Sequence, residues 1–335
     1  MPPNTISSET TDFADFTNYA LTPITLEQSI AHIKADKAHK KGHKGRGIKV
    51  AVIDTGVDSD HPLIDGRVVS EKSFVEGEPA DDEQGHGSWC ASAILAVAPE
   101  AEIVNAKALS KTGSGSALGL MQSMEWAAQQ GCKVISCSWG GSIPFEPLRD
   151  LVIAMEKNYG CKLIFAAGNS GPGERTINFP GGYSEVVAVG AIAVVNPEPD
   201  AIARFSSRGP GPTGKIEPDI SAPGGSEEEG IEGAWKDGGM KVARGTSMAT
   251  PQVAGAVALL METCGSSEEA VELLYETARD VKTQGKDNDS GYGVVDIEAA
   301  LEEQQAPPAR VYQINAVLKT PFGDWPITGI ATEKK

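Results

Sequence analysis

The chain has 335 residues, 40% of them hydrophobic, and its 29 basic and 46 acidic side chains give a formal net charge of −17. This excess of acids excludes general nucleic-acid binding, which needs a positively charged surface. No apolar run reaches the about 18 residues that a membrane helix needs, so we expect no membrane-spanning segment.

The first two thirds of the sequence alternate strand-like and helix-like segments. Residues 1–27 are polar and irregular and are predicted to be an N-terminal extension, followed by a short helix within 28–40. Unbroken apolar runs, typical of strands covered on both faces, follow at Gly47–Asp54, Glu102–Leu109, Lys133–Gly140, Lys162–Asn169 and Val186–Ile192. Helices are predicted between them at Ser88–Val97, Ala117–Gln130 and Glu146–Lys157. This alternation predicts an α/β fold in three layers, with a mainly parallel central sheet flanked by helices.

The remainder of the chain is predicted to be helical and then irregular. Residues 247–302 look mainly helical, and residues 303–335 form a C-terminal extension with four prolines. Its stretch RVYQINAVLK alternates enough to be a strand. We therefore predict one domain over 28–302 with an extension at each end.

The cysteines and the N-terminal sequence indicate in which cellular compartment the protein is expected. Their number, five, is odd and no Cys-x-x-Cys pair occurs, so neither a disulfide framework nor a zinc site is expected. The N-terminal MPPNTISSETTDFADF lacks the basic and apolar parts of a secretory signal. Free thiols and no signal favour a cytoplasmic over a secreted protein, provided that the sequence starts at its natural N-terminus.

Three short patterns carry residue types that act together in acyl transfer. VIDTGVDSDHP places Asp54 at a strand end, GHGSWCAS places His86 before an apolar helix, and GTSMATP places Ser247 at the head of a long helix. Alone, these residues would be read as a helix cap, a core histidine and an N-cap. Together, they are the orienting acid, the general base and the nucleophile of a serine hydrolase, in the known chain order Asp, His, Ser.

A fourth pattern, FAAGNSG, supplies a donor for the oxyanion. The amide of Asn169 follows a predicted strand, as Asp54 and Ser138–Gly140 do, and carboxyl ends of parallel strands meet at one edge of a sheet. The helix start at Ser247 also directs N–H groups toward developing negative charge. Pro251 is expected to fall within the first turn of that helix, where a missing N–H costs nothing.

In these motifs, the chain resembles the subtilases, the subtilisin-like serine endopeptidases. The matching segments occur in family order over residues 28–302: IKA, VAVIDTGVDSDHP, GHGSWCAS, SGSALGLMQSMEWA, SWGG, AAGNSG, FSSRGP, PDISAPGG, GTSMATPQVAGA and DSGYGVVD. The resemblance implies a subtilisin-like fold and peptide-bond hydrolysis through an acyl-enzyme. It assigns Asp54, His86 and Ser247 to the triad and Asn169 to the oxyanion hole. It also implies that Gly113, Ser114, Gly115, Ser138, Trp139 and Gly140 bind substrate backbone as edge strands.

Some positions depart from the family pattern. Asn178 stands where glycine is common, so we expect a narrower or more polar primary pocket, and Trp139 replaces a common leucine and is expected to fill a subsite. The loop that often carries a strong calcium site is reduced to AVAPEAE, and Leu63 replaces an expected aspartate. Since calcium needs six or more oxygen ligands, we expect that site to be lost, with a weaker one elsewhere left open. No organic cofactor is expected.

The expected partners are peptide or protein substrates, with no nucleic acid and no membrane. Residues 1–27 are a candidate inhibitory segment over the cleft, with ALTPIT as its expected contact. A protease dedicated to one peptide precursor and a non-catalytic peptide-binding module remain alternatives. Phosphate binding by TGSGSALG is disfavoured because the GxGxxG spacing is missing.

Overall fold

The computed structural model describes residues 5–6, 21–194, 200–305, 311–320 and 323–332. The chain divides into two units, Met1–Leu301 and Glu302–Lys335. The first unit contains every residue of the predicted catalytic site.

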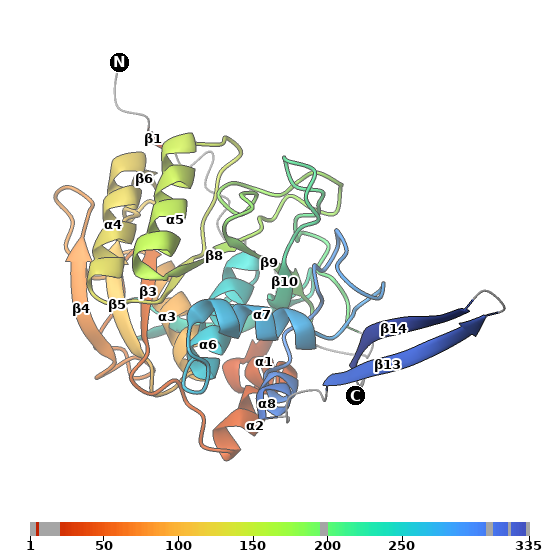
Figure 1. Ribbon diagram of the computed structural model, residues 1–335. Coiled ribbons are helices and arrows are strands. Elements are labelled where there is room, and N and C mark those ends of the chain that lie inside the picture. The colour runs from red at the N-terminus through yellow and green to blue at the C-terminus, as the bar shows by residue number, and fades with distance from the viewer. Residues whose placement is uncertain (1–4, 7–20, 195–199, 306–310, 321–322, 333–335) are drawn as a thin grey trace. The chain divides into compact units, whose positions relative to one another are not determined.

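A seven-stranded sheet lies at the centre of the first unit (Figure 1). All of its strand pairs are parallel, in the order β10-β9-β8-β7-β3-β5-β4. The strands are β3 (Lys49–Asp54), β4 (Val68–Ser73), β5 (Glu102–Lys107), β7 (Val134–Cys137), β8 (Lys162–Ala166), β9 (Val187–Ile192) and β10 (Ile220–Pro223). From β3 the chain runs to β4 and β5 on one side and then crosses to β7 on the other side of β3. Open α/β sheets bind ligands at the carboxyl ends of the strands where the strand order reverses in this way.

Helices cover both faces of this sheet, so the unit has three layers (Figure 1). Val50 and Val52 of β3 pack in the core with α3 and α6, whereas Ala51 and Ile53 pack in a second core with α4 and α5. The bounds of these helices are α3 (His86–Val97), α4 (Ala117–Gln129), α5 (Glu146–Tyr159) and α6 (Thr246–Leu260). Burial on both faces explains why the strands read as unbroken apolar runs, and it confirms the predicted three-layer α/β fold.

The four helices differ in how far they are buried. Helix α5 buries Leu148, Val152 and Met155, which share one face at helical spacing. Every residue of α6 is buried, and its sequence is apolar on all sides. The nucleophile predicted at Ser247 therefore lies on a helix that is enclosed by the rest of the unit.

The remaining helices lie at the start and end of the first unit. Thr25 and Gln28 form a capping box at the start of α1, and Ser266 caps α7. Their bounds are α1 (Leu26–His32), α2 (Ala35–Lys40), α7 (Ser267–Thr277) and α8 (Ile297–Gln305). No helix in the described ranges is both long and apolar enough to cross a membrane.

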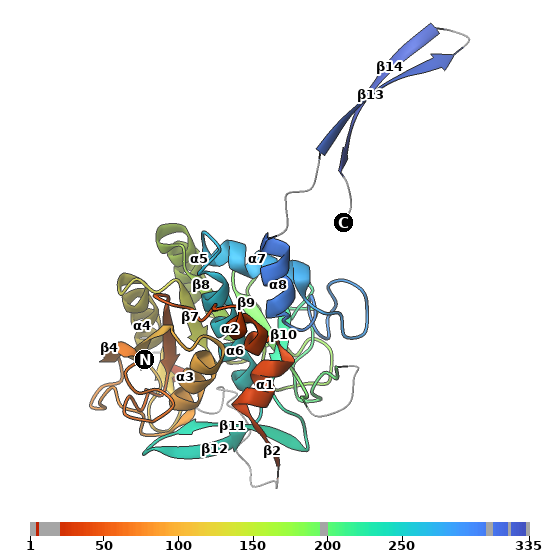
Figure 2. The same cartoon turned by 90° about the horizontal axis from the view of Figure 1, so that it is seen from below.

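A smaller sheet of three strands, in the order β12-β11-β2, packs beside α3 and α1 (Figure 2). Its strands are β2 (Thr22–Thr25), β11 (Glu229–Trp235) and β12 (Gly239–Ala243). The buried indole of Trp89 on α3 donates to the carbonyl oxygens of Ile231 and Lys241, 3.2 Å from each. Most of the segment ALTPIT is thus part of a sheet; its Ala20 lies outside the described residues.

Two short strands and one hairpin complete the described chain. β1 (Thr5–Ile6) pairs antiparallel with β6 (Gly115–Ser116). In the second unit, β13 (Val311–Thr320) and β14 (Gly323–Thr332) form an antiparallel hairpin, so the strand predicted in RVYQINAVLK is confirmed over its described residues. The division into a 28–302 domain and two extensions stays a prediction, and parts of both extensions lie outside the described residues.

Candidate active site

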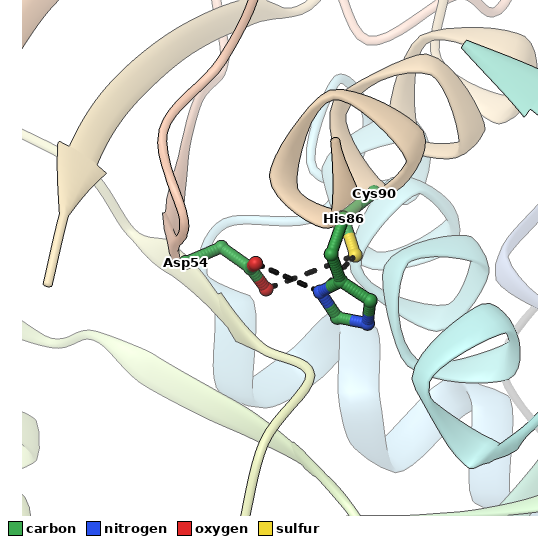
Figure 3. A group of neighbouring side chains, drawn as sticks. All are labelled: Asp54, His86 and Cys90. Carbon is green, nitrogen blue, oxygen red and sulfur yellow. Dashed lines mark hydrogen bonds and ion pairs between the residues drawn. The ribbon is translucent and has the colours of Figure 1, made fainter. Parts of the chain in front are cut away.

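Asp54 and His86 form a buried hydrogen-bonded pair at the carboxyl end of β3 (Figure 3). Asp54 is the last residue of β3 and His86 is the first of α3. The distance from His86 Nδ1 to Asp54 Oδ1 is 2.7 Å, and the Thr55 N–H donates to the same oxygen at 2.8 Å. A proton on Nδ1 is held by the carboxylate, which makes Nε2 the nitrogen that can accept a proton.

The charge of Asp54 changes the proton affinity of His86. Burial, the largest single influence, would lower the pKa of this histidine, but the charge and hydrogen bond of Asp54, together with contributions from Cys90, outweigh burial and raise the pKa well above 6.5. The imidazolium form is therefore stabilised in this pocket, which is what a general base needs after it has accepted a proton.

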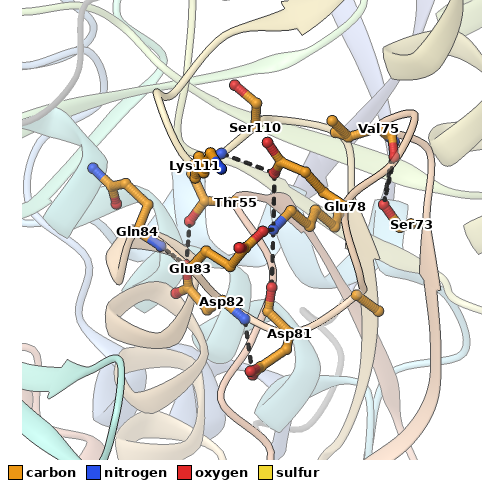
Figure 4. A network of polar contacts seen from close by, with 12 residues as sticks. Thr55, Ser73, Val75, Glu78, Asp81, Asp82, Glu83, Gln84, Ser110 and Lys111 are labelled. Carbon is orange, nitrogen blue, oxygen red and sulfur yellow. Dashed lines mark hydrogen bonds and ion pairs between the residues drawn. The ribbon is translucent and has the colours of Figure 1, made fainter.

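A carboxylate outside the predicted site, Asp82, holds the two segments that carry this pair (Figure 4). Its Oδ1 accepts from the Thr55 hydroxyl at 2.9 Å and from the Gly85 N–H at 2.7 Å, and its Oδ2 accepts from the N–H and hydroxyl of Ser88. Gly85 precedes α3 and has no side chain to cap the helix, so Asp82 does so from three residues upstream. This role of Asp82 was not predicted, although an aspartate shortly before a helix start is a capping signal.

A buried lysine fixes the acidic loop around Asp82. Lys107, at the end of β5, has no exposed surface and donates to the Asp81 carbonyl at 2.9 Å. Its ammonium also lies 3.2 Å from Glu78 Oε2 and 3.3 Å from Glu83 Oε2. Because a buried ammonium needs such partners, Lys107 ties the loop to the sheet beside Asp54.

Ser247 lies at the start of α6 and contacts β7's carboxyl end. Its hydroxyl donates to the Ser138 carbonyl oxygen at 2.9 Å, and the Ser138 hydroxyl donates to the Ser247 carbonyl oxygen at 3.0 Å. The Cys90 thiol links this region to the Asp54–His86 pair, since Cys90 Sγ is 3.9 Å from His86 Nδ1 and from the Ser247 carbonyl oxygen. The structure thus brings the three predicted triad residues into one buried region.

The expectation for Pro251 was wrong. Pro251 lies inside α6, which begins at Thr246, rather than in a first turn where backbone N–H groups lack partners. The residue four positions after Ser247 would normally donate to the Ser247 carbonyl, and proline has no N–H with which to do so. The Ser138 hydroxyl donates to that carbonyl instead.

Asn169 is oriented by the residue that precedes Ser247. Its Oδ1 accepts from the Thr246 N–H at 2.9 Å and from the Thr246 hydroxyl at 3.1 Å. Thr246 Oγ1 in turn accepts from the Gly168 N–H at 3.2 Å. With the amide oxygen engaged in this way, Nδ2 is the end of Asn169 that can donate.

Cys90 packs against the Asp54–His86 pair, one helical turn after His86 (Figure 3). Burial is the largest influence on the thiol and raises its pKa, so the residue is held as a neutral thiol. Among the described residues, Asp54, His86 and Cys90 form the one group of three side chains that could offer metal ligands within a few ångströms. All five cysteines are buried and free, as the odd number indicated.

The predicted substrate-binding residues lie in three segments. Gly113 and Ser114 form a turn in which the Gly113 N–H donates to Ser110, and Gly115 begins β6. Ser138–Gly140 follows β7 directly. Asn178 is nearly buried, and a side chain on Gly168 would come within 2.8 Å of its amide group, so Asn178 packs against the backbone that leads into Asn169.

Trp139 does not fit the expected subsite. Its side chain is 1% exposed, its Nε1 donates to the Ile53 carbonyl at 2.8 Å, and its ring meets Phe165 edge to face. The indole belongs to the core between the sheet and α4–α5, so we no longer assign its side chain a substrate contact. The peptide-backbone role of 138–140 stays a prediction.

Known proteins resemble this chain in sequence over most of the first unit. The family model described as "Peptidase_S8: Subtilase family" matches residues 45–293. Subtilisin Savinase of Lederbergia lenta is 36% identical over 281 residues, which cover 81% of this chain and 97% of that protein. Subtilisin DY of Bacillus licheniformis is 34% identical over 294 residues, which cover 83% of this chain and 99% of that protein. An intracellular serine protease of Paenibacillus polymyxa is 37% identical over 245 residues, which cover 68% of this chain and 70% of that protein. The chain therefore belongs to the subtilase family and is a subtilisin-like serine endopeptidase.

Proposed function

We propose that Ser247 is the nucleophile of this endopeptidase, His86 its general base and Asp54 the acid that orients His86. One observation carries the proposal: the 2.7 Å pair of His86 and Asp54 lies beside the start of α6, where Ser247 is held. The carboxyl ends of β3 and β7 supply Asp54 and Ser138 at one edge of the sheet. Acyl transfer to a serine needs an acid, a base and a nucleophile close together, and the closeness of these three residues supports the assignment.

The chemistry proceeds in two halves. The Ser247 hydroxyl turns from Ser138 toward His86, its proton moves to His86 Nε2, and Oγ bonds to the substrate carbonyl carbon. The C–N bond then breaks as His86 returns the proton to the leaving amine. In the second half, His86 takes a proton from water, the resulting hydroxide displaces Ser247 from the acyl carbon, and the serine regains the proton. Asn169 Nδ2 and the Ser247 N–H are proposed to donate to the oxyanion.

A fluorophosphonate probe tests the assignment of Ser247, because it forms a covalent bond only with an activated serine. We expect labelling of the intact protein at Ser247, located by peptide mass mapping, and none after Ser247→Ala. A protein that retains the fold as a peptide-binding module alone would not be labelled. Products from a mixed peptide library then separate a general protease from one dedicated to a single precursor sequence.

The pH dependence tests the assignment of His86. Since the base must be neutral to accept a proton, we expect kcat/KM to rise with pH through an apparent pKa above 6.5. Asp54→Asn removes the charge that raises this pKa, so the rise should move to lower pH while kcat falls. Asp58→Asn is the matched control, because Asp58 accepts from the Gly238 N–H outside the pair. An unshifted profile in Asp54→Asn would contradict the assignment.

We also propose that residues near the N-terminus occupy part of the substrate-binding edge. The pairing of β1 with β6 supports this, since β6 begins at Gly115, one of the predicted substrate-binding residues. An extended segment that adds a strand there competes with a substrate for the same backbone groups. The contact involves Thr5–Ile6 rather than the ALTPIT segment that we expected.

Deletion of residues 1–10 should therefore raise initial peptidase activity and lower KM, because it removes β1 and leaves β2 in its sheet. The measurement is the initial rate against a short peptide at several concentrations. Added peptide of sequence 1–10 should inhibit the shortened protein competitively. Equal KM values for both forms would count against an inhibitory contact.

We propose that the loop after α3 does not hold calcium. It offers Glu100, but the carboxylate of this residue lies 2.6 Å from Arg46 Nε and 3.3 Å from Lys44 Nζ. Leu63 has no ligand atom in its side chain, and calcium needs six or more oxygen ligands, which supports the proposed loss. The melting temperature is expected to be the same with EDTA and with added calcium, by scanning calorimetry; a large fall in EDTA would overturn this.

We propose a reducing compartment for the protein. The five buried, free thiols support it, since secreted proteins more often pair their cysteines.

A further inference from the structure

The backbone of the predicted nucleophile lacks one bond of an ordinary helix. Within α6, the carbonyl of Ser247 would accept from the N–H of residue 251, but that residue is proline. Ser247 has no exposed surface, so water does not readily replace this donor. A buried carbonyl without a donor costs free energy, so another group must supply the hydrogen bond.

Ser138 supplies it from a different part of the fold. The Ser138 hydroxyl, 1% exposed, donates to the Ser247 carbonyl at 3.0 Å, whereas the Cys90 thiol is 3.9 Å from the same oxygen and is a weaker donor. The Ser138 carbonyl accepts the Ser247 hydroxyl at 2.9 Å, so two hydrogen bonds join these residues. One holds the backbone of Ser247 and the other holds its hydroxyl in the resting state.

The residues on either side of Ser138 fix its position relative to the central sheet. Cys137 before it pairs with Phe165 in the central sheet, and Trp139 after it is anchored by its indole bond to the Ile53 carbonyl. Ile53 directly precedes Asp54. The same strand ends therefore fix Ser138 and the acid of the triad, and Ser138 transmits that fixed position to Ser247.

We propose that the Ser138 hydroxyl is a positioning group for the nucleophile: it replaces the helical hydrogen bond that Pro251 removes and so sets where Ser247 Oγ lies for attack. This rests on the proposed function, in which Ser247 is the nucleophile. It is separate from the predicted binding of substrate backbone by 138–140, because the hydroxyl acts on the Ser247 carbonyl. Misplacing a nucleophile by a fraction of an ångström slows acylation more than it weakens substrate binding.

The test is the rate of fluorophosphonate labelling and kcat in Ser138→Ala, at a temperature where the variant is folded by circular dichroism. We expect both rates to fall about 10- to 100-fold, with KM within about threefold, since a buried carbonyl loses its donor. Ser136→Ala is the matched control. Ser136 lies in β7, two residues before Ser138, and is also buried. Its hydroxyl has no hydrogen-bond partner among the described residues, so the parental rate is expected.

Pro251→Ala distinguishes positioning from general loss of structure, because alanine restores an N–H four residues after Ser247. The factor by which Ser138→Ala lowers the labelling rate and kcat should be at least about threefold smaller in the Pro251→Ala background. Comparing the four proteins also covers the case in which Ser138→Ala alone does not fold, since the double variant is expected to fold and to react.

The outcomes separate cleanly. Three results would each overturn the positioning role. The first is labelling of Ser138→Ala at the parental rate. The others are a loss of labelling rate and kcat that is the same whether residue 251 is proline or alanine, and an equal loss in Ser136→Ala. Failure of the unaltered protein to be labelled at Ser247 would instead overturn the proposed function on which this role depends.

Discussion

Replacing Ser247 with alanine is expected to lower kcat by about 10⁶, the magnitude measured for the serine of the triad in subtilisin, a member of the same family. The reason is that Ser247 is the group proposed to form the acyl bond, so the variant loses the covalent route. Residual catalysis over water comes from oxyanion stabilisation and binding alone. The measurement is the steady-state rate with a chromogenic peptide, together with the affinity of the variant for a product peptide, which should change little.

Ser123→Ala is the control for this prediction. Ser123 is a buried serine on α4, on the opposite face of the sheet, and its hydroxyl donates to the Leu120 carbonyl at 2.7 Å. That variant should keep parental kcat. Activity above about 1% in Ser247→Ala, after contaminating protease has been excluded by active-site titration, would show that the nucleophile lies elsewhere.

Replacing Asn169 is expected to cost about 10²–10³ in kcat with little change in KM, as for the equivalent donor of subtilisin. Asn169 has two possible roles, since its oxygen also accepts from Thr246. Asn169→Asp separates them: it keeps an oxygen that can accept from Thr246 but loses the N–H donor. If the donor matters, Asn169→Asp should be as impaired as Asn169→Leu.

The comparison is made under steady-state conditions with both variants at equal folded concentration. Near-parental kcat in Asn169→Asp together with a low kcat in Asn169→Leu would mean that Asn169 only holds Thr246. In that case, the assignment of Asn169 as the oxyanion donor would be wrong, while its structural contact with Thr246 would be supported.

The sequence predicted best those features that depend on nearby residues. The unbroken apolar runs marked five of the seven central strands because both faces of the sheet are covered. It missed two strands of the central sheet: β4, whose residues are half-buried or exposed, and the four-residue β10. It also missed the small sheet of β2, β11 and β12, in which the pairing of β2 with β11 joins segments about 200 residues apart.

The residues proposed for the reaction stand in short motifs that can be recognised in the sequence: Asp54, His86, Asn169 and Ser247. Asp82 and the hydroxyl of Ser138, in contrast, act through contacts that only folding creates. Trp139 shows that a position in the sequence does not give the direction of a side chain. The residue lies next to a predicted binding strand, yet its ring points into the core.

The enclosure of α6 has a consequence for synthesis of the protein. The helix packs against α3 and the central strands, and it is encoded after residue 245, behind all seven strands of the central sheet. A growing chain therefore carries Asp54 and His86 long before Ser247, the proposed nucleophile, and cannot form an acyl-enzyme there until α6 has been made. Parallel sheets with such distant pairings also fold slowly, so proteolytic competence should be among the last properties that a newly translated molecule acquires.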